Sequence, residues 1–113
     1  MRTLFTAATL ALCASLAFAH SKVDTTLPKD GAVLQAAPEV VALNFGAKIR
    51  LTKVELTAPD AKPEDMDLSA HKSFGTEFEL PLTDAGAGLY QIDWRGLSAD
   101  GHAVQGSFSF QVE

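Results

Sequence analysis

The chain has 113 residues, 47% of them hydrophobic, and its fourteen acidic against nine basic side chains give a net charge of −5. This length allows one domain, and the hydrophobic content argues against a disordered chain. The acidic surface does not favour contact with nucleic acid or with anionic lipid. We therefore expect a single folded domain with no nucleic-acid partner.

Residues 1–19 have the form of a cleavable signal peptide. Arg2 gives a positive start, residues 4–16 form an apolar run, and residues 17–19 make a small-x-small cleavage site. The run is short for a membrane span and no second one follows, so we expect an exported protein that is not inserted in the membrane. Export would leave a domain of residues 20–113 that begins at His20.

Cys13 raises an alternative to simple cleavage, because lipid attachment also uses a cysteine near the end of an apolar run. Leu12 stands where such a site needs a small residue, so we favour cleavage after Ala19. Cleavage there removes Arg2 and Cys13, which leaves eight basic against fourteen acidic side chains and a net charge of −6. The exported chain would then contain neither a disulfide nor a thiolate metal site.

The exported part shows the period-two alternation of half-buried strands from its start. Residues 21–27 and 39–45 predict two strands, with a short turn at residues 46–47. Residues 48–57 continue in strand, but the apolar phase slips by one, which predicts a bulge at Thr52 and Lys53. Residues 58–73 lose the alternation and predict a long irregular connection.

The last third of the chain predicts three more strands. Residues 76–82 alternate, and Pro81 places this strand at a sheet edge or near its own end. Residues 89–95 and 107–112 flank a loop in which Asp100-Gly101 is a strong turn signal. About seven short strands without crossover helices predict an all-β Greek-key barrel or sandwich, antiparallel, with Trp94 as a central core residue.

The loop after Trp94 and the start of the exported chain together offer a set of metal ligands. His20 as the first residue would present both a free amine and an imidazole to one ion, while Asp100 and His102 add a carboxylate and a second imidazole. Nitrogen and oxygen donors without sulfur suit Cu(II), and Zn(II) tolerates the same ligands at lower intrinsic affinity. The amine must lose a proton to bind, so affinity should rise with pH.

The chain resembles the CopC family of periplasmic copper-resistance and copper-homeostasis proteins. The resemblance spans residues 20–113, and its most specific part is Tyr-x-Ile-x-Trp-Arg-x-x-Ser-x-Asp-Gly-His-x-x-x-Gly-x-Phe-x-Phe, which begins at Tyr90. It implies a cupredoxin-like or immunoglobulin-like β domain in the periplasm that binds one Cu(II) through His20, Asp100 and His102. It also implies an inner-membrane CopD-type partner, and we expect the chain itself to be a monomer.

Some members of this family also hold Cu(I) in a methionine-rich loop. The matching segment, residues 58–73, offers only Met66 and His71, so the chain resembles the Cu(II)-only branch. We interpret His71 as a surface loop residue.

Two other functions compete with copper storage or delivery by a protein that is not an enzyme. A redox enzyme with a histidine brace, similar to lytic polysaccharide monooxygenases, would use His20 in the same way. Against it, the chain is short for a substrate platform, and Asp100 would fill a position that oxygen needs. A structural β module without metal would leave both His20 and His102 without a role.

Overall fold

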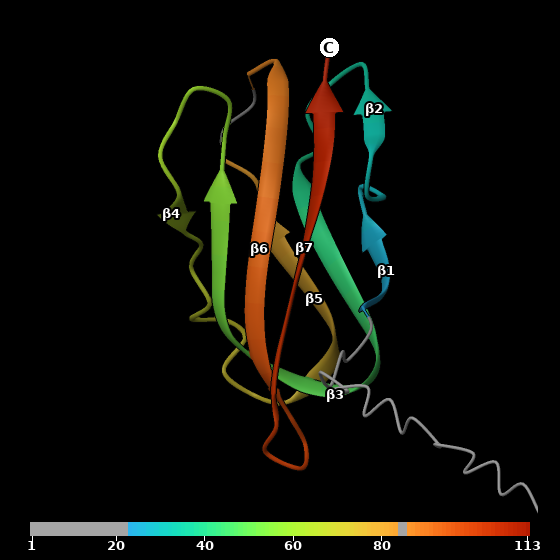
Figure 1. Cartoon of the computed structure of the whole chain (residues 1–113), viewed down its shortest axis with the longest axis vertical. Coiled ribbons are helices and arrows are strands. Elements are labelled where there is room, and N and C mark those ends of the chain that lie inside the picture. Colours follow the sequence, from blue (N-terminus) through green and yellow to red (C-terminus); the bar gives the residue numbers. More distant parts are fainter. Residues whose placement is uncertain (1–22, 84–85) are drawn as a thin grey trace, which may run out of the picture.

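The computed structural model describes residues 23–83 and 86–113, and these contain seven strands and no helix. The strands are β1 (Val23–Leu27), β2 (Ala32–Leu34), β3 (Val40–Thr57), β4 (Glu64–Asp65), β5 (Gly75–Pro81), β6 (Gly88–Ser98) and β7 (Ala103–Val112). Within these residues there is no helix long and apolar enough to cross a membrane. The predicted all-β class is confirmed, and Figure 1 shows the strands running along the long axis of the domain.

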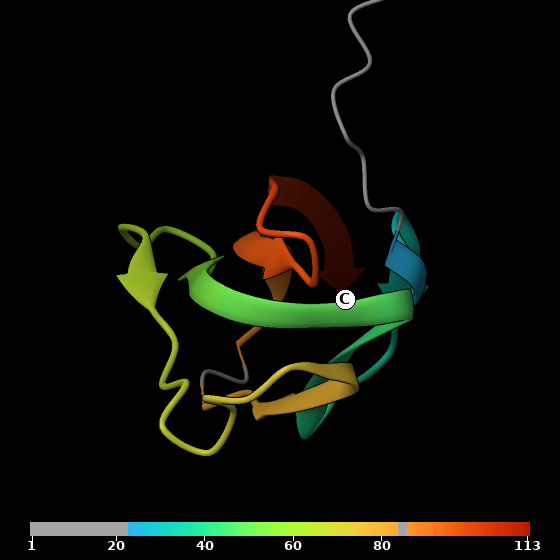
Figure 2. The ribbon, with the colours of Figure 1, turned by 90° about the horizontal axis from the view of Figure 1, so that it is seen from below.

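The long strand β3 connects two layers of the fold. Its first half pairs with β1 and β5, and its second half pairs with β6 and, at Glu55 and Leu56, with β4. Strand β7 then follows β6, and β2 closes that side, so the main strand order is β1-β3-β6-β7-β2. Seen from below, β6 and β7 lie on one side of β3 and β5 lies on the other (Figure 2). The core fills the space between these layers.

Two predictions about β3 have opposite outcomes. The predicted turn at residues 46–47 is wrong, because β3 continues from Val40 to Thr57 without a break. The exposed Gly46-Ala47 segment instead marks the place where β3 changes its main partners, from β1 and β5 before it to β6 after it, with one further β5 pair at Ile49 and Gly75. The predicted bulge is confirmed, since the register with β6 shifts between Leu51 and Lys53.

The other strands also differ from expectation in details. Within residues 21–27 an even alternation would put Val23, Thr25 and Leu27 on one face, but Val23 packs against the core while Leu27 is 57% exposed and Thr26 is buried. Strand β2 was not predicted, and its pairing with β7 is parallel, unlike every other pair among the described residues. Pro81 lies as expected on an edge strand, because β5 pairs only with β3.

Aromatic rings fill the centre of the core, as the position of Trp94 predicts. The ring of Phe45 meets Trp94 edge-on at 5.0 Å between centroids and Phe78 at 5.9 Å, while Tyr90 stacks on Phe110 at 5.1 Å. These geometries add to the stability that the buried area provides. The core therefore holds the β6–β7 hairpin rigidly, and the predicted metal ligands lie in the loop at the end of that hairpin.

Candidate metal centre

The β6–β7 hairpin closes through a short loop between Ser98, the last residue of β6, and Ala103, the first of β7. The backbone amide of Ser98 donates to the carbonyl of His102 at 2.9 Å, and the amide of Gly101 donates to the carbonyl of Ser98, also at 2.9 Å. Gly101 has a φ of +87°, a conformation that glycine adopts without the steric penalty of a side chain. The Asp-Gly turn predicted from the sequence is therefore present.

This turn brings Asp100 and His102 into direct contact. Their side chains form an ion pair of 2.8 Å between Oδ2 of Asp100 and Nδ1 of His102. Both side chains remain about two-thirds exposed, so the pair stands in the solvent at the end of the hairpin. Two of the three predicted ligands are thus adjacent and accessible to an ion.

The contact also determines which histidine nitrogen is free. When the ring of His102 is neutral, its proton sits on Nδ1 in the hydrogen bond to the carboxylate, and the lone pair resides on Nε2. A carboxylate that orients an imidazole in this way is the usual outer partner of a metal-binding histidine. The arrangement therefore leaves Nε2 of His102 free for an incoming ion, while Asp100 lies on the Nδ1 side of the ring and would bind the same ion only once its contact with Nδ1 is released.

Ser98 holds the carboxylate from the other side, a role that the sequence analysis did not assign. Its hydroxyl donates to Oδ1 of Asp100, and the backbone amide of His102 donates to the Ser98 hydroxyl at 3.2 Å and to Oδ1 of Asp100 at 3.3 Å. The hydrogen bonds from Ser98 and then from His102 lower the pKa of Asp100 to about 2. Asp100 is consequently ionised at any pH at which a histidine titrates.

We expect the substitution Ser98→Ala to raise the pKa of Asp100 from about 2 toward the ordinary value near 3.9, because the first cause of the lowering is removed. An NMR titration of the Asp100 carboxyl carbon measures this directly. Ser98→Thr should keep the low pKa, and Ser107→Ala, on β7 away from the loop, should leave it unchanged. An unaltered Asp100 pKa in Ser98→Ala would contradict this role for Ser98.

His20, the third predicted ligand, lies outside the described residues. Among residues 23–83 and 86–113, no group of three or more His, Cys, Asp or Glu side chains gathers in one place. The described chain begins at Val23, which pairs with Phe45 of β3. Four residues further along β3, Ile49 pairs with Ser98 at the base of the loop. The start of β1 and the Asp100–His102 loop therefore lie toward the same end of the domain (Figure 1).

His71 and Met66 have structural contacts. Nε2 of His71 donates to the backbone carbonyl of Glu79 at 2.8 Å, and its ring lies edge-on to Phe78 at 5.6 Å. His71 is half-buried, and these contacts link the 66–73 segment to β5. Its interpretation as a surface loop residue was therefore incomplete. Met66 packs against the hydrophobic core. Neither contact suggests a soft-metal site.

Comparison with known proteins agrees along nearly the whole chain. Residues 23–113 match the family model described as the CopC domain. Copper resistance protein C of Pseudomonas syringae pv. tomato is 33% identical, over 98% of this chain and 93% of its own. Copper resistance protein C of Escherichia coli is 30% identical, over 86% of this chain and 84% of its own.

Solved structures show the same fold. The crystal structure of CopC from Methylosinus trichosporium OB3b superposes with a TM-score of 0.68 at 24% identity, covering 83% of this chain and 94% of that one. The structure of PcoC, a methionine-rich copper resistance protein from Escherichia coli, gives a TM-score of 0.57 at 25% identity and covers 84% and 100%. This chain, by contrast, has only two methionines, Met1 and Met66.

Proposed function

The chain belongs to the CopC family, and we propose that it is a copper-binding protein of copper resistance that holds one Cu(II) ion per chain through His20, Asp100 and His102. The observation that carries the proposal is the exposed Asp100–His102 pair, in which the carboxylate fixes the imidazole and leaves Nε2 free. Copper is the cargo of the protein in this proposal. The chain sequesters the ion or delivers it and catalyses no reaction.

The donor set favours Cu(II) over other common ions. His102 contributes an imidazole nitrogen, Asp100 an oxygen, and His20, once it is the first residue, an amine and a second imidazole. Three nitrogens and one oxygen can surround a Cu(II) ion in its preferred tetragonal plane, and Cu(II) lies above Zn(II) in intrinsic affinity for such ligands. The absence of sulfur among these donors supports the Cu(II)-only interpretation.

The length of chain before β1 is compatible with this site. Two residues separate His20 from Val23, and an extended chain of three residues spans about 10 Å. Strand β1 starts toward the end of the domain where the loop lies. This arrangement requires export and cleavage after Ala19, so the proposal includes a periplasmic location and a removed signal peptide.

The low pKa of Asp100 means that the pH dependence of copper affinity comes from the nitrogen ligands. The pKa of Asp100 is about 2, so this carboxylate stays ionised when the pH falls from alkaline to mildly acidic. Only the nitrogen ligands take up protons in that range. The free amine, with an ordinary pKa of about 7.7–8.0, and the imidazoles must all be deprotonated to bind. Copper affinity should therefore rise with pH through this range and be lost as pH falls.

We expect Cu(II) to stabilise the exported chain against heating. A ligand that binds only the folded state at about 1,000 times its dissociation constant contributes roughly 4 kcal/mol. Thermal melts of the chain starting at His20, with Cu(II) and with Zn(II), measure this, and Cu(II) should give the larger shift. A melting temperature that Cu(II) leaves unchanged would favour a structural β module without metal.

A further inference from the structure

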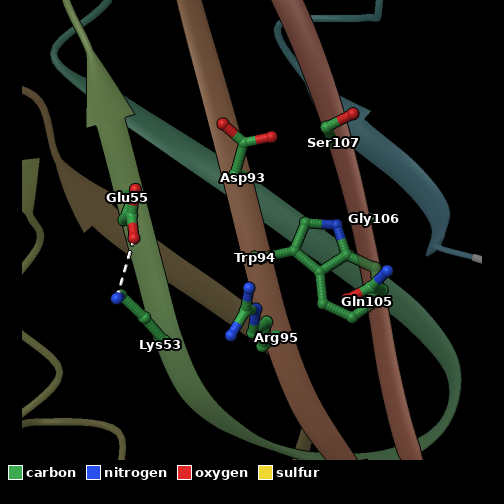
Figure 3. Close-up of a pocket in the computed structure, with 8 residues that line it drawn as sticks. All are labelled: Lys53, Glu55, Asp93, Trp94, Arg95, Gln105, Gly106 and Ser107. Atoms are coloured by element: carbon green, nitrogen blue, oxygen red, sulfur yellow. Dashed lines mark ion pairs between the residues drawn. The ribbon is translucent and has the colours of Figure 1, made fainter. Parts of the chain in front are cut away.

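A groove of about 490 Å³ lies on the outer face of strands β3, β6 and β7, and the residues that line it are distinct from the Asp100–His102 loop, called the copper loop below. It is lined by side chains of both charges, as Figure 3 shows, together with Trp94 and Gly106 at its floor. The lining includes Lys53, Glu55, Asp93, Trp94, Arg95 and Gly106. None of these residues has a role in the proposed copper site.

The floor of the groove is the backbone of β6 and β7 at Trp94 and Gly106. Trp94 and Gly106 are paired across β6 and β7, and the indole lies over Gly106. A Cβ at position 106 would lie 2.7 Å from Cζ2 of Trp94, which leaves no room for any other residue. Trp94 is a core residue, so Gly106 makes room for the indole on the core side of the sheet, and the groove meets only backbone at this point.

The charges in the groove are sorted by sign into two neighbouring rows. One row crosses the sheet with Lys53 directly opposite Arg95, and the next row has Glu55 directly opposite Asp93. Like charges in directly opposite positions destabilise a sheet, whereas exchanging the two residues of one strand would place opposite charges together. Within the fold, Lys53 is balanced by Glu55 at 2.8 Å and by Asp65 at 3.9 Å, whereas Arg95 has no such close partner among the described residues.

Arg95 is the group with the most unused binding capacity. Lys53 pairs with Glu55 at 2.8 Å, and Asp93 accepts hydrogen bonds from Gln91. The exposed guanidinium of Arg95 makes no hydrogen bond or ion pair with any residue in the described part of the chain. Arginine binds a carboxylate through two parallel hydrogen bonds, so Arg95 offers a ready anchor for an acidic side chain.

We propose that this groove docks an extended segment of a partner protein that carries an acidic residue and, two positions away, a basic residue. The two rows are two residues apart along β6, which is about 6.7 Å, and the same spacing separates alternate side chains of an extended segment. The acidic residue then binds Arg95 beside Lys53, and the basic residue binds Asp93 beside Glu55. The occupant is thus a segment whose acidic and basic residues match the positive and negative rows of the groove.

The position of the groove gives the docking a purpose that rests on the proposed function. The Arg95–Gln105 pair lies three residue pairs from the Ser98–His102 end of the hairpin, or about 10 Å along the strands. A partner held in the groove is therefore brought next to the copper loop without covering it. This placement suits a protein that receives copper from the chain or passes copper to it.

The test is an NMR titration of the exported chain at low ionic strength with the capped peptide Gly-Asp-Thr-Lys-Gly. We expect amide shifts confined to residues 93–95 and 105–107. The neutral peptide Gly-Asn-Thr-Gln-Gly should cause none, and Gly-Asp-Lys-Thr-Gly, whose charges are adjacent, should bind more weakly. Absence of localised shifts with the first peptide would overturn the proposal, and so would concentration-dependent shifts without peptide, which would mark this face as a contact between copies.

Three variants, one of them a control, test whether these residues form the docking site. Arg95→Glu should weaken peptide binding at least about ten-fold, whereas Lys29→Glu, which changes the net charge equally on an exposed turn, should not. The double exchange Lys53→Glu with Glu55→Lys should raise the melting temperature and weaken the peptide, because opposite charges then face each other within the sheet. Equal binding by Arg95→Glu would sink the docking site. Copper binding should be unchanged in all three proteins, so the docking site can fail while the copper site stands.

Discussion

Replacing His102 by alanine is expected to reduce the Cu(II) affinity of the exported chain by more than about 100-fold. Loss of an outer partner of a metal ligand already costs about 10–100-fold, and His102 is proposed to be a ligand itself. The change also removes the imidazole that pairs with Asp100 at 2.8 Å, so the carboxylate loses its orientation. A titration in competition with a chelator of known affinity measures the effect.

His71→Ala is the matched control for this experiment. His71 binds the carbonyl of Glu79 and packs on Phe78, so its loss should lower the melting temperature while leaving Cu(II) affinity unchanged. Because His102 is exposed at the end of a hairpin, its own replacement should barely change the melting temperature without copper. Wild-type affinity in His102→Ala would remove the loop from the site.

Adding one residue ahead of His20 is expected to have a comparable effect. The added residue converts the amine of His20 into an amide, which removes one donor and breaks the chelate that a first histidine can form. The Cu(II) affinity should fall sharply, and the pH dependence that comes from the amine should disappear. Chelator-competition titrations of the chain with and without an added glycine, at several pH values, measure both changes.

A cleavable extension provides the internal control, because its removal should restore the original affinity in the same sample. If the extended and the cleaved chains bind Cu(II) equally and with the same pH dependence, the amine is not a ligand. Copper would then be held by side chains alone.

The sequence allowed the β6–β7 half of the fold to be predicted well because its pattern is local. The alternation of Tyr90, Ile92 and Trp94 with polar residues directly states which face of β6 is buried, and the structure agrees. The passage of β3 through Gly46-Ala47 could not be predicted in the same way. Small exposed residues are compatible with a turn or with a continuing strand, and here the strand continues because it exchanges β1 and β5 for β6.

Non-local pairing also explains the other misses. Strand β2 has three residues, and it forms because the chain after Gly31 runs beside β7, almost eighty positions away. The inward position of Thr26 in place of Leu27 follows the shifted register between β1 and β3. A pattern within a single strand carries no information about such partners.

In the candidate site, too, local contacts could be predicted from the sequence and non-local contacts could not. Asp100 and His102 lie two residues apart around an Asp-Gly turn, so their contact could be expected from the sequence. Ser98 was overlooked, although a serine near a turn commonly bonds a nearby backbone group, as its hydroxyl does here with the amide of His102. The contact of His71 with Glu79 depends on how the 66–73 segment folds onto β5, and no local sequence pattern predicts that contact.

The most direct measurement of the central proposal is a native mass spectrum of the exported protein with one equivalent of Cu(II). We predict a chain that begins at His20 and retains a single copper ion, because export creates the amine and the Asp100–His102 loop supplies the remaining ligands. A chain that begins at another residue, or one that begins at His20 and stays free of copper, would contradict the proposed site.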